Sequence, residues 1–256
     1  MKAVRETLGL FDVRVWQVGG AERPLLYLHG FEQHPGAASF LAKLGDRHSV
    51  RAPEHPGYWG STGFEHVEDI FDLTLHYRRL LERWNVGPVD VVGHDLGGMF
   101  AAELAAIAPQ LVRRLVLVSP YGLWLDDAPM PDPFVMNPAA LAKAKWHGPE
   151  NAGGEPSAFD PTEGEPIAMF RAHNLATATK FLWPIPDRGL KRRLQYVAAP
   201  TLIVRGASDG LFPALYLDAW KAAIADARAV TLDDAGHLPM VEAEDAFIDV
   251  VGEFLA

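Results

Sequence analysis

The stretch Gly93-His94-Asp95-Leu96-Gly97 places a carboxylate between two glycines, directly after an apolar run and directly before a helical pattern. A strand that turns sharply into a helix exposes the residue at the apex in a strained conformation, and the flanking glycines allow the close backbone approach that the turn requires. The carboxylate of Asp95 would then lie at a helix N-terminus, where the helix dipole and free N–H groups favour negative charge. Aspartate is also a good helix cap, so a purely structural N-cap role is the alternative.

Two further residues follow predicted strands and could complete a site around Asp95. Asp209 comes shortly after one apolar run, and His237 lies between another run and the last helical pattern. Because reactive groups on parallel sheets gather at the carboxyl ends of the strands, all three side chains are expected at one edge. Their order along the chain is that of a nucleophile, an acid and a histidine. Asp233 and Asp234, which lie close to His237, compete with Asp209 for the role of orienting the histidine.

The positioning elements are predicted by apolar runs that alternate with helical patterns. Several runs are apolar on both faces, as buried parallel strands are. The alternation predicts an α/β fold with a mostly parallel sheet flanked by helices. Strands are expected at 13–19, 24–30, 49–54, 89–94, 113–120, 199–206 and 227–234, and helices at 67–84, 96–110 and 240–256.

The middle of the chain, residues 121–190, differs in composition from the rest. Stretches rich in proline, glycine and acidic residues, 125–138 and 150–166, flank two helical pieces that carry aromatic residues. Such a composition cannot extend a buried sheet, so we expect an inserted helical cap with irregular loops. The expected domains are a core of residues 1–120 and 191–256 and a cap of residues 121–190.

With these motifs in order, the chain resembles the α/β-hydrolase superfamily over essentially its whole length. Asp95 stands where the superfamily pattern G-x-S-x-G has a serine. The resemblance implies that Asp95 is the nucleophile, Asp209 the acid and His237 the base.

The early segment His29-Gly30-Phe31 ends a predicted strand, as a loop that offers an N–H to an oxyanion must. The resemblance implies an oxyanion hole formed by the backbone N–H groups of Phe31 and Leu96. His29 and His94 are interpreted as holding the loop and the turn in shape.

An aspartate nucleophile suits a different electrophile than serine does. With an unperturbed pKa of about 3.9 it is already ionised at neutral pH. Its attack on an ester is unproductive, because the mixed anhydride expels carboxylate more readily than alkoxide. Attack on the sp³ carbon of an epoxide or alkyl halide instead gives an alkyl ester of Asp95, which His237 and water can hydrolyse. This is the route of epoxide hydrolases and haloalkane dehalogenases, which the segment "GHDLGG" resembles.

The leaving group needs a donor, and no subfamily pattern is fully matched. Epoxide hydrolases use cap tyrosines, but no tyrosine lies between Tyr121 and Tyr196. Haloalkane dehalogenases often have tryptophan where Leu96 stands, and fluoroacetate dehalogenases have arginines beside the nucleophile, which are missing here. Other side chains are therefore the candidates for binding substrate, although the aromatic ones could equally be apolar lining. These candidates are Tyr121, Trp124, Trp146, His147, His173 and Trp183.

Two alternatives stay open for the function. The segments "HGFEQHPG" and "VSPYGLWLDDAP" resemble serine-type esterases and carbon–carbon bond hydrolases, so Asp95 could replace a serine on such a scaffold. The other alternative is a non-catalytic relative that binds a small apolar ligand.

Composition excludes several other classes of protein. The 256 residues carry a net charge of -10, and the basic cluster at 188–194 is interpreted as a solvated helix face, so nucleic acid and anionic membrane are not expected as partners. With no cysteine and no long apolar segment, a cytoplasmic protein is expected. No cofactor or metal is expected, since no H-E-x-x-H or comparable spacing occurs. The expected partner is a small apolar organic substrate, and the oligomeric state is not predicted.

Overall fold

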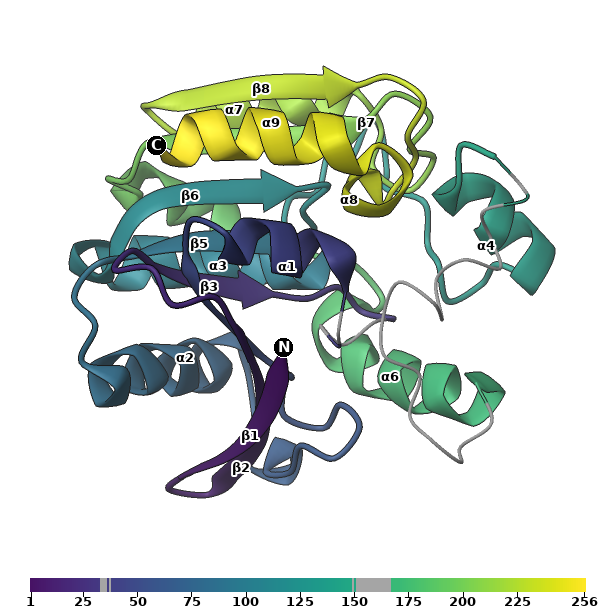
Figure 1. Ribbon diagram of the computed structural model, residues 1–256. Helices are drawn as coiled ribbons and strands as arrows, with labels where there is room; N and C mark the ends of the chain where they lie inside the picture. Colours follow the sequence, from purple (N-terminus) through teal and green to yellow (C-terminus); the bar gives the residue numbers. More distant parts are fainter. Residues whose placement is uncertain (33–35, 37, 149, 151–166) are drawn as a thin grey trace.

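A single eight-stranded sheet organises the computed structural model, which describes residues 1–32, 36, 38–148, 150 and 167–256 (Figure 1). The strand order is β1-β2-β4-β3-β5-β6-β7-β8. The strands are β1 Lys2–Leu8, β2 Phe11–Val18, β3 Pro24–Leu28, β4 Ser49–Pro53, β5 Val89–His94, β6 Val112–Val118, β7 Thr201–Gly206 and β8 Ala227–Leu232.

The sheet is parallel from β4 to β8, and β2 runs antiparallel to both of its neighbours, β1 and β4. All residues of strands β5 and β7 are buried, which explains why valine, leucine and isoleucine occur on both faces of these strands. Strand β1 was not predicted from the sequence. It is an edge strand with mostly exposed side chains and therefore lacks the apolar run that marks the inner strands.

Helices cover both faces of the sheet and create two hydrophobic cores. Helices α2, α3 and α7 pack into one core, and α1 and α9 pack into the other. The predicted mostly parallel sheet flanked by helices is thereby confirmed. The helices are α1 Ser39–Gly45, α2 Ile70–Trp84, α3 Leu96–Ile107, α4 Pro138–Lys145, α6 Ile167–Leu182, α7 Leu215–Ala223, α8 Pro239–Glu242 and α9 Glu244–Leu255.

The last predicted helix is in fact two helices, because the backbone leaves the helical region at Ala243 (φ -123°, ψ 50°). Helices α1 and α7 were not predicted from the sequence. By contrast, α2 begins at a clear signal: Asp69 caps the helix and forms a reciprocal capping box with Asp72.

Between β6 and β7 the chain leaves the sheet and forms α4 and α6, which lie beyond the carboxyl ends of the strands (Figure 1). We refer to residues 121–190 as the inserted segment. Most of its acidic and glycine-rich stretch, residues 151–166, lies outside the described residues. No helix within the described ranges is both long and apolar enough to cross a membrane.

Candidate active site

Asp95 lies at the tight turn between β5 and α3, with φ 56° and ψ -117°. This positive φ is unfavourable for a residue with a side chain and costs on the order of 1–3 kcal/mol. The glycines on either side permit the turn. A Cβ at Gly97 would lie 2.2 Å from the Leu28 carbonyl oxygen, and a Cβ at Gly93 would lie 2.4 Å from the Gly97 carbonyl oxygen. The turn therefore depends on both glycines.

The N-cap alternative for Asp95 is wrong in this structure. The residue occupies the N-cap position of α3, but its side chain makes no capping hydrogen bond. Instead its Oδ2 atom lies 3.2 Å from Nε2 of His237, and only 1% of the residue is exposed. The carboxylate thus faces the histidine and not its own helix.

His237 bridges two carboxylates from different parts of the chain. Its Nδ1 lies 3.0 Å and 3.1 Å from the two carboxylate oxygens of Asp209, which follows β7. Asp209 in turn accepts hydrogen bonds from the Ser119 hydroxyl at 2.7 Å and from the N–H groups of Leu211 and Phe212, both at 2.9 Å. These donors fix the carboxylate that orients the histidine ring.

Asp233 and Asp234, the competing acids, are exposed. Asp234 lies near the exposed ring of His147. The structure thus brings Asp95, His237 and Asp209 together and leaves the other two carboxylates at the surface.

Burial and pairing shift the pKa values of the three groups. Burial raises the pKa of Asp95 to about 6, although the hydrogen bond and charge of His237 oppose this rise. Burial alone would lower the pKa of His237, but the Asp209 and Asp95 carboxylates outweigh it and raise the pKa to about 10. Burial opposes ionisation of Asp209 as well, yet the charge of His237 holds its pKa below the usual value. Pairing with the two carboxylates thus favours the protonated ring of His237, whereas burial disfavours the charged form of Asp95.

Two main-chain donors lie next to the Asp95 carboxylate. The N–H groups of Phe31 and Leu96 are close enough to lower its pKa, although Oδ1 makes no hydrogen bond of normal geometry within the described part of the chain. Both amides belong to the residues that the sequence resemblance assigned to an oxyanion hole. They come from the loop after β3 and from the first residue of α3.

The two histidines of the motifs are held by main-chain contacts. His29 Nε2 accepts from the N–H of His55 at 2.9 Å, and His94 Nε2 lies 2.9 Å from the carbonyl oxygen of His237. His94, Asp95 and His237 are also the one group of described residues whose ligand atoms, all within 4.8 Å of one another, could hold a metal ion. Since His94 and His237 are already engaged as described, the arrangement is explained by hydrogen bonding.

The expected substrate-binding residues divide into two groups. Tyr121 is buried beside the site, and its ring centroid lies 6.5 Å from that of His237. Trp146 is also buried, and Trp124 is half-buried with its Nε1–H bonded to Asp126.

His173 is exposed on α6, and Trp183 is 55% exposed, so the structure does not place these two at Asp95. His147 is likewise exposed and lies 2.8 Å from the hydroxyl of Ser208. Periodicity could not show which face of α6 turns inward, and Trp183 and His147 lie outside the helices.

Tyr58, in the loop after β4, was missed by the sequence analysis. Its hydroxyl and that of Tyr121 are buried and find no hydrogen-bond partner among the residues that the structure describes. Burial, followed by the charge of Asp95, raises the pKa of each phenol well above its usual value, so both remain protonated donors. A buried hydroxyl without a hydrogen-bond partner lowers the stability of the fold. Both hydroxyls could therefore donate to a bound molecule.

A pocket of about 620 Å³ lies between α4 and α6, and Glu32, the residue after Phe31, is part of its lining. Its lining is mostly apolar, and Phe134 on its wall lies 6.3 Å from the ring of Phe31. A volume of this size suits a small organic molecule.

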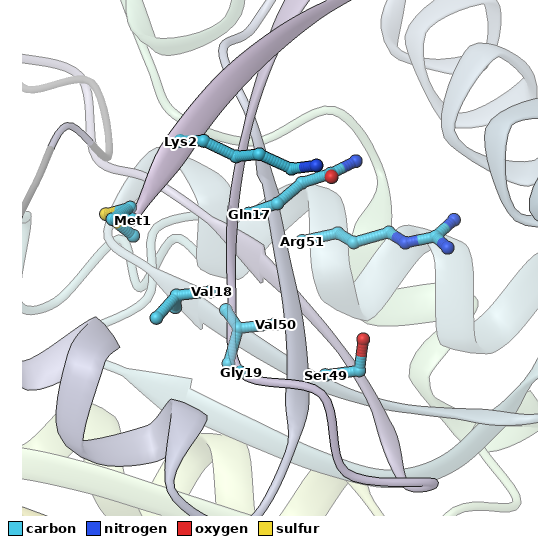
Figure 2. Close-up of a pocket in the computed structure, with 8 residues that line it drawn as sticks. All are labelled: Met1, Lys2, Gln17, Val18, Gly19, Ser49, Val50 and Arg51. Carbon is cyan, nitrogen blue, oxygen red and sulfur yellow. The ribbon is translucent and has the colours of Figure 1, made fainter.

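Figure 2 shows a different pocket of about 450 Å³, formed by β1, β2 and β4 around Lys2, Gln17 and Arg51. Ser49 in its lining begins β4, so this pocket lies at the amino ends of the parallel strands. It is separate from the site at the carboxyl ends.

The fold and the strand-to-helix turn define the class of protein. Residues 25–250 match the model of the alpha/beta hydrolase family, and the chain belongs to that family and is a hydrolase. The predicted superfamily is confirmed.

Its curated relatives include esterases and lipases. The chain is 27% identical over 252 residues to the pimeloyl-[acyl-carrier protein] methyl ester esterase of Xanthomonas campestris pv. campestris, covering 91% of this chain and 94% of that protein. It is 25% identical over 256 residues to lipase 1 of Psychrobacter immobilis, with 95% and 80% covered. A solved membrane phospholipase A shares the fold with a TM-score of 0.81 at 19% identity, covering 99% of this chain and 85% of that one.

Proposed function

We propose that this hydrolase opens epoxides through a covalent ester of Asp95. The observation that carries the proposal is the position of the Asp95 carboxylate at the strand-to-helix turn, 3.2 Å from a histidine that Asp209 orients. A carboxylate needs no base to become a nucleophile, so the histidine is free for a second step.

In the first step a carboxylate oxygen of Asp95 attacks an epoxide carbon. The carbon–oxygen bond of the ring breaks, and its electron pair stays on the departing oxygen, which takes up a proton from the hydroxyl of Tyr58 or Tyr121. The product is a hydroxyalkyl ester of Asp95 with no atom lost from the substrate.

In the second step His237 takes a proton from a water molecule, which attacks the carbonyl carbon of that ester. The negative charge that develops on the carbonyl oxygen is stabilised by the N–H groups of Phe31 and Leu96. In the collapse of the tetrahedral intermediate the alkoxide departs, takes the proton from His237 and leaves as a diol. The carboxylic acid of Asp95 then loses the second water proton, which restores the phenol used in the first step and the Asp95 carboxylate. Esterification removes the negative charge of Asp95, one cause of the raised pKa of His237, and this favours the neutral ring that the step needs.

Tyr58 and Tyr121 favour an epoxide over an alkyl halide as the substrate. A halide leaves as an anion without protonation, whereas the oxygen of an opening epoxide needs a donor. Both phenols are buried near Asp95 without a partner in the described chain, which is the arrangement that a developing alkoxide requires.

We expect Tyr58→Phe and Tyr121→Phe each to slow epoxide opening by about 10-fold to 10²-fold, because each removes one donor to the departing oxygen. Alkylation by an alkyl bromide of similar size should change much less. Rapid-quench mass spectrometry of the protein adduct measures both rates. The matched control is Tyr196→Phe, since Tyr196 is 61% exposed. Equal losses on both substrates would contradict the donor role.

The pH dependence follows from the raised pKa of Asp95. We expect the rate of ester formation to rise with pH with a midpoint near 6, because only the ionised carboxylate attacks. Below that midpoint the rate should fall about tenfold per pH unit. Single-turnover rates between pH 4.5 and 8, each corrected for opening without enzyme, provide the measurement. A midpoint near the ordinary carboxyl value would show that the nucleophile is not this buried group.

A single turnover in H₂¹⁸O tests the proposed function directly. Hydrolysis of the ester should place one labelled oxygen in the peptide that contains Asp95, while the first diol carries an unlabelled oxygen from the protein. Label found in the diol and never in the protein would show direct attack by water.

Ester hydrolysis is the second candidate, and the esterase and lipase names of two relatives favour it. In this case Asp95 stands in place of a serine, and Asp95→Ser should give a large gain in the hydrolysis of aryl esters or of carbon–carbon bonds. No gain would remove this candidate. A non-catalytic binder is less well supported, because binding alone requires neither Asp209 nor His237.

A further inference from the structure

Two residues of the inserted segment contact Glu32, which lies in the loop that carries the Phe31 amide. Lys145, the last residue of α4, forms a buried ion pair with Glu32, the residue after Phe31, and each side chain is 3% exposed. Asn174 on α6 is fully buried and donates from Nδ2 to the main-chain oxygen of Glu32 at 2.8 Å. The peptide next to the oxyanion donor is thus held by both described helices of the inserted segment.

The same end of α4 also holds the other two catalytic loops. The main-chain oxygen of Lys145 accepts from the N–H of His237 at 2.7 Å, and the oxygen of Ala144 accepts from the N–H of Gly210, next to Asp209, at 2.8 Å. Lys145 therefore contacts the histidine loop through its main chain and the oxyanion loop through its side chain.

A buried ion pair is weak evidence for stability, because the cost of removing two charges from water offsets their attraction. Its geometry, however, is specific, and misplacing a catalytic group by about 1 Å can cost on the order of 10²-fold in rate. These considerations point to alignment as the role of the pair.

We infer that Lys145, with Glu32 and Asn174, is a positioning group that aligns the Phe31 N–H with Asp95 and His237. The inference rests on the proposed function in one respect: it assigns the effect to hydrolysis of the Asp95 ester. In that step the carbonyl oxygen becomes an oxyanion, whereas in the first step the carboxylate loses charge. Loss of the contacts that Lys145 and Asn174 make with Glu32 should therefore slow the second step more than the first.

The test compares Lys145→Met with Lys143→Met, which alters an exposed lysine of the same helix. We expect Lys145→Met to slow decay of the ester of Asp95 by about 10-fold to 10²-fold while the rate of ester formation changes less than threefold. The adduct of a small epoxide such as styrene oxide, followed by intact mass after rapid quench, reports both rates. Lys145→Arg should restore most of the decay rate.

Equal slowing of both steps, or a change in KM alone, would overturn the inference and indicate a substrate contact in the 620 Å³ pocket. If Lys145→Met does not fold because Glu32 is left buried and unpaired, the double variant Glu32→Met with Lys145→Met removes both charges and should fold. It should show the same slow decay, and normal decay would contradict the role.

A second measurement does not depend on the proposed chemistry. Amide hydrogen exchange at Phe31 should be about tenfold faster in the double variant than in the wild-type protein, while exchange at Leu96 stays the same. If the wild-type protein forms no ester with an epoxide, the proposed function fails and this measurement still decides the positioning role. Unchanged exchange at Phe31 would refute it.

Discussion

We expect Asp95→Ala to lower epoxide turnover by at least about 10⁴-fold, because the variant lacks the atom that attacks and only binding and the oxyanion donors remain. No covalent adduct should form, even at high substrate concentration. Steady-state diol formation and intact mass after quench measure the two effects. Alanine is preferred over asparagine here, since an asparagine amide can hydrolyse back to aspartate and restore activity.

The matched control for this variant is Asp233→Ala, which removes an exposed aspartate four positions before His237 in the chain. Its turnover should equal that of the wild-type protein. Circular dichroism should show that both variants are folded. Residual activity of Asp95→Ala within tenfold of wild type would show that another group, or water itself, attacks the substrate.

The local structure at Asp95 argues for catalysis over passive binding. The residue has a positive φ, its carboxylate is buried with a raised pKa, and its Oδ1 lacks a hydrogen bond within the described chain. Each of these features is unfavourable for folding, and strained or perturbed groups of this kind cluster at functional sites. A binding protein would have no physical need for a charged group in this position.

Much of the fold could be predicted because its central strands carry a strong signal. Strand β5 is buried on both faces, and its valines lie on both sides of the strand just before the turn. The edge strand β1 has no such pattern, and α1 is a seven-residue helix without a side-chain cap. Neither element is therefore evident from the sequence. The break between α8 and α9 is caused by the non-helical backbone conformation of Ala243, which the periodicity of apolar residues does not predict.

The candidate triad could be found for a topological reason. Residues that follow parallel strands are expected to meet at one edge of the sheet. Strand positions, the glycines on either side of Asp95 and the order along the chain therefore predict that Asp95, Asp209 and His237 lie together. The predicted role of Asp209 stays a prediction about catalysis, but its contact with His237 is given by the structure.

The residues that surround the triad could not be predicted, because no simple sequence pattern marks them. Tyr58 lies in an irregular loop, and the pairing of Glu32 with Lys145 joins residues 113 positions apart. His173 and Trp183 were expected near the substrate because they are aromatic or basic and lie in the inserted segment. The exposure of His173 depends on how α6 is rotated, which its weak amphipathic pattern did not determine, and Trp183 follows the end of that helix.

The second large effect is expected for His237→Gln, which should stop the reaction after one chemical step. The ester of Asp95 still forms, but no base activates water, so one equivalent of adduct accumulates and diol release falls by at least about 10³-fold. Because epoxide opening loses no atoms, the mass of the protein should rise by the full mass of the substrate. Tandem mass spectrometry of the digested protein should locate the adduct on Asp95.

The choice of pH decides whether this trapping experiment is informative. The hydrogen bond and charge of His237 lower the pKa of Asp95, so their loss should raise that pKa above about 6 and leave less of the nucleophile ionised at neutral pH. Trapping should therefore be faster at pH 8.5 than at pH 6.5 in the variant, and this contrast should exceed that of ester formation in the wild-type protein. The control His147→Gln changes an exposed histidine and should release diol normally. If His237→Gln formed neither adduct nor diol at high pH, the histidine would be required for the first step, as in serine-type catalysis, and the two-step route through Asp95 would be wrong.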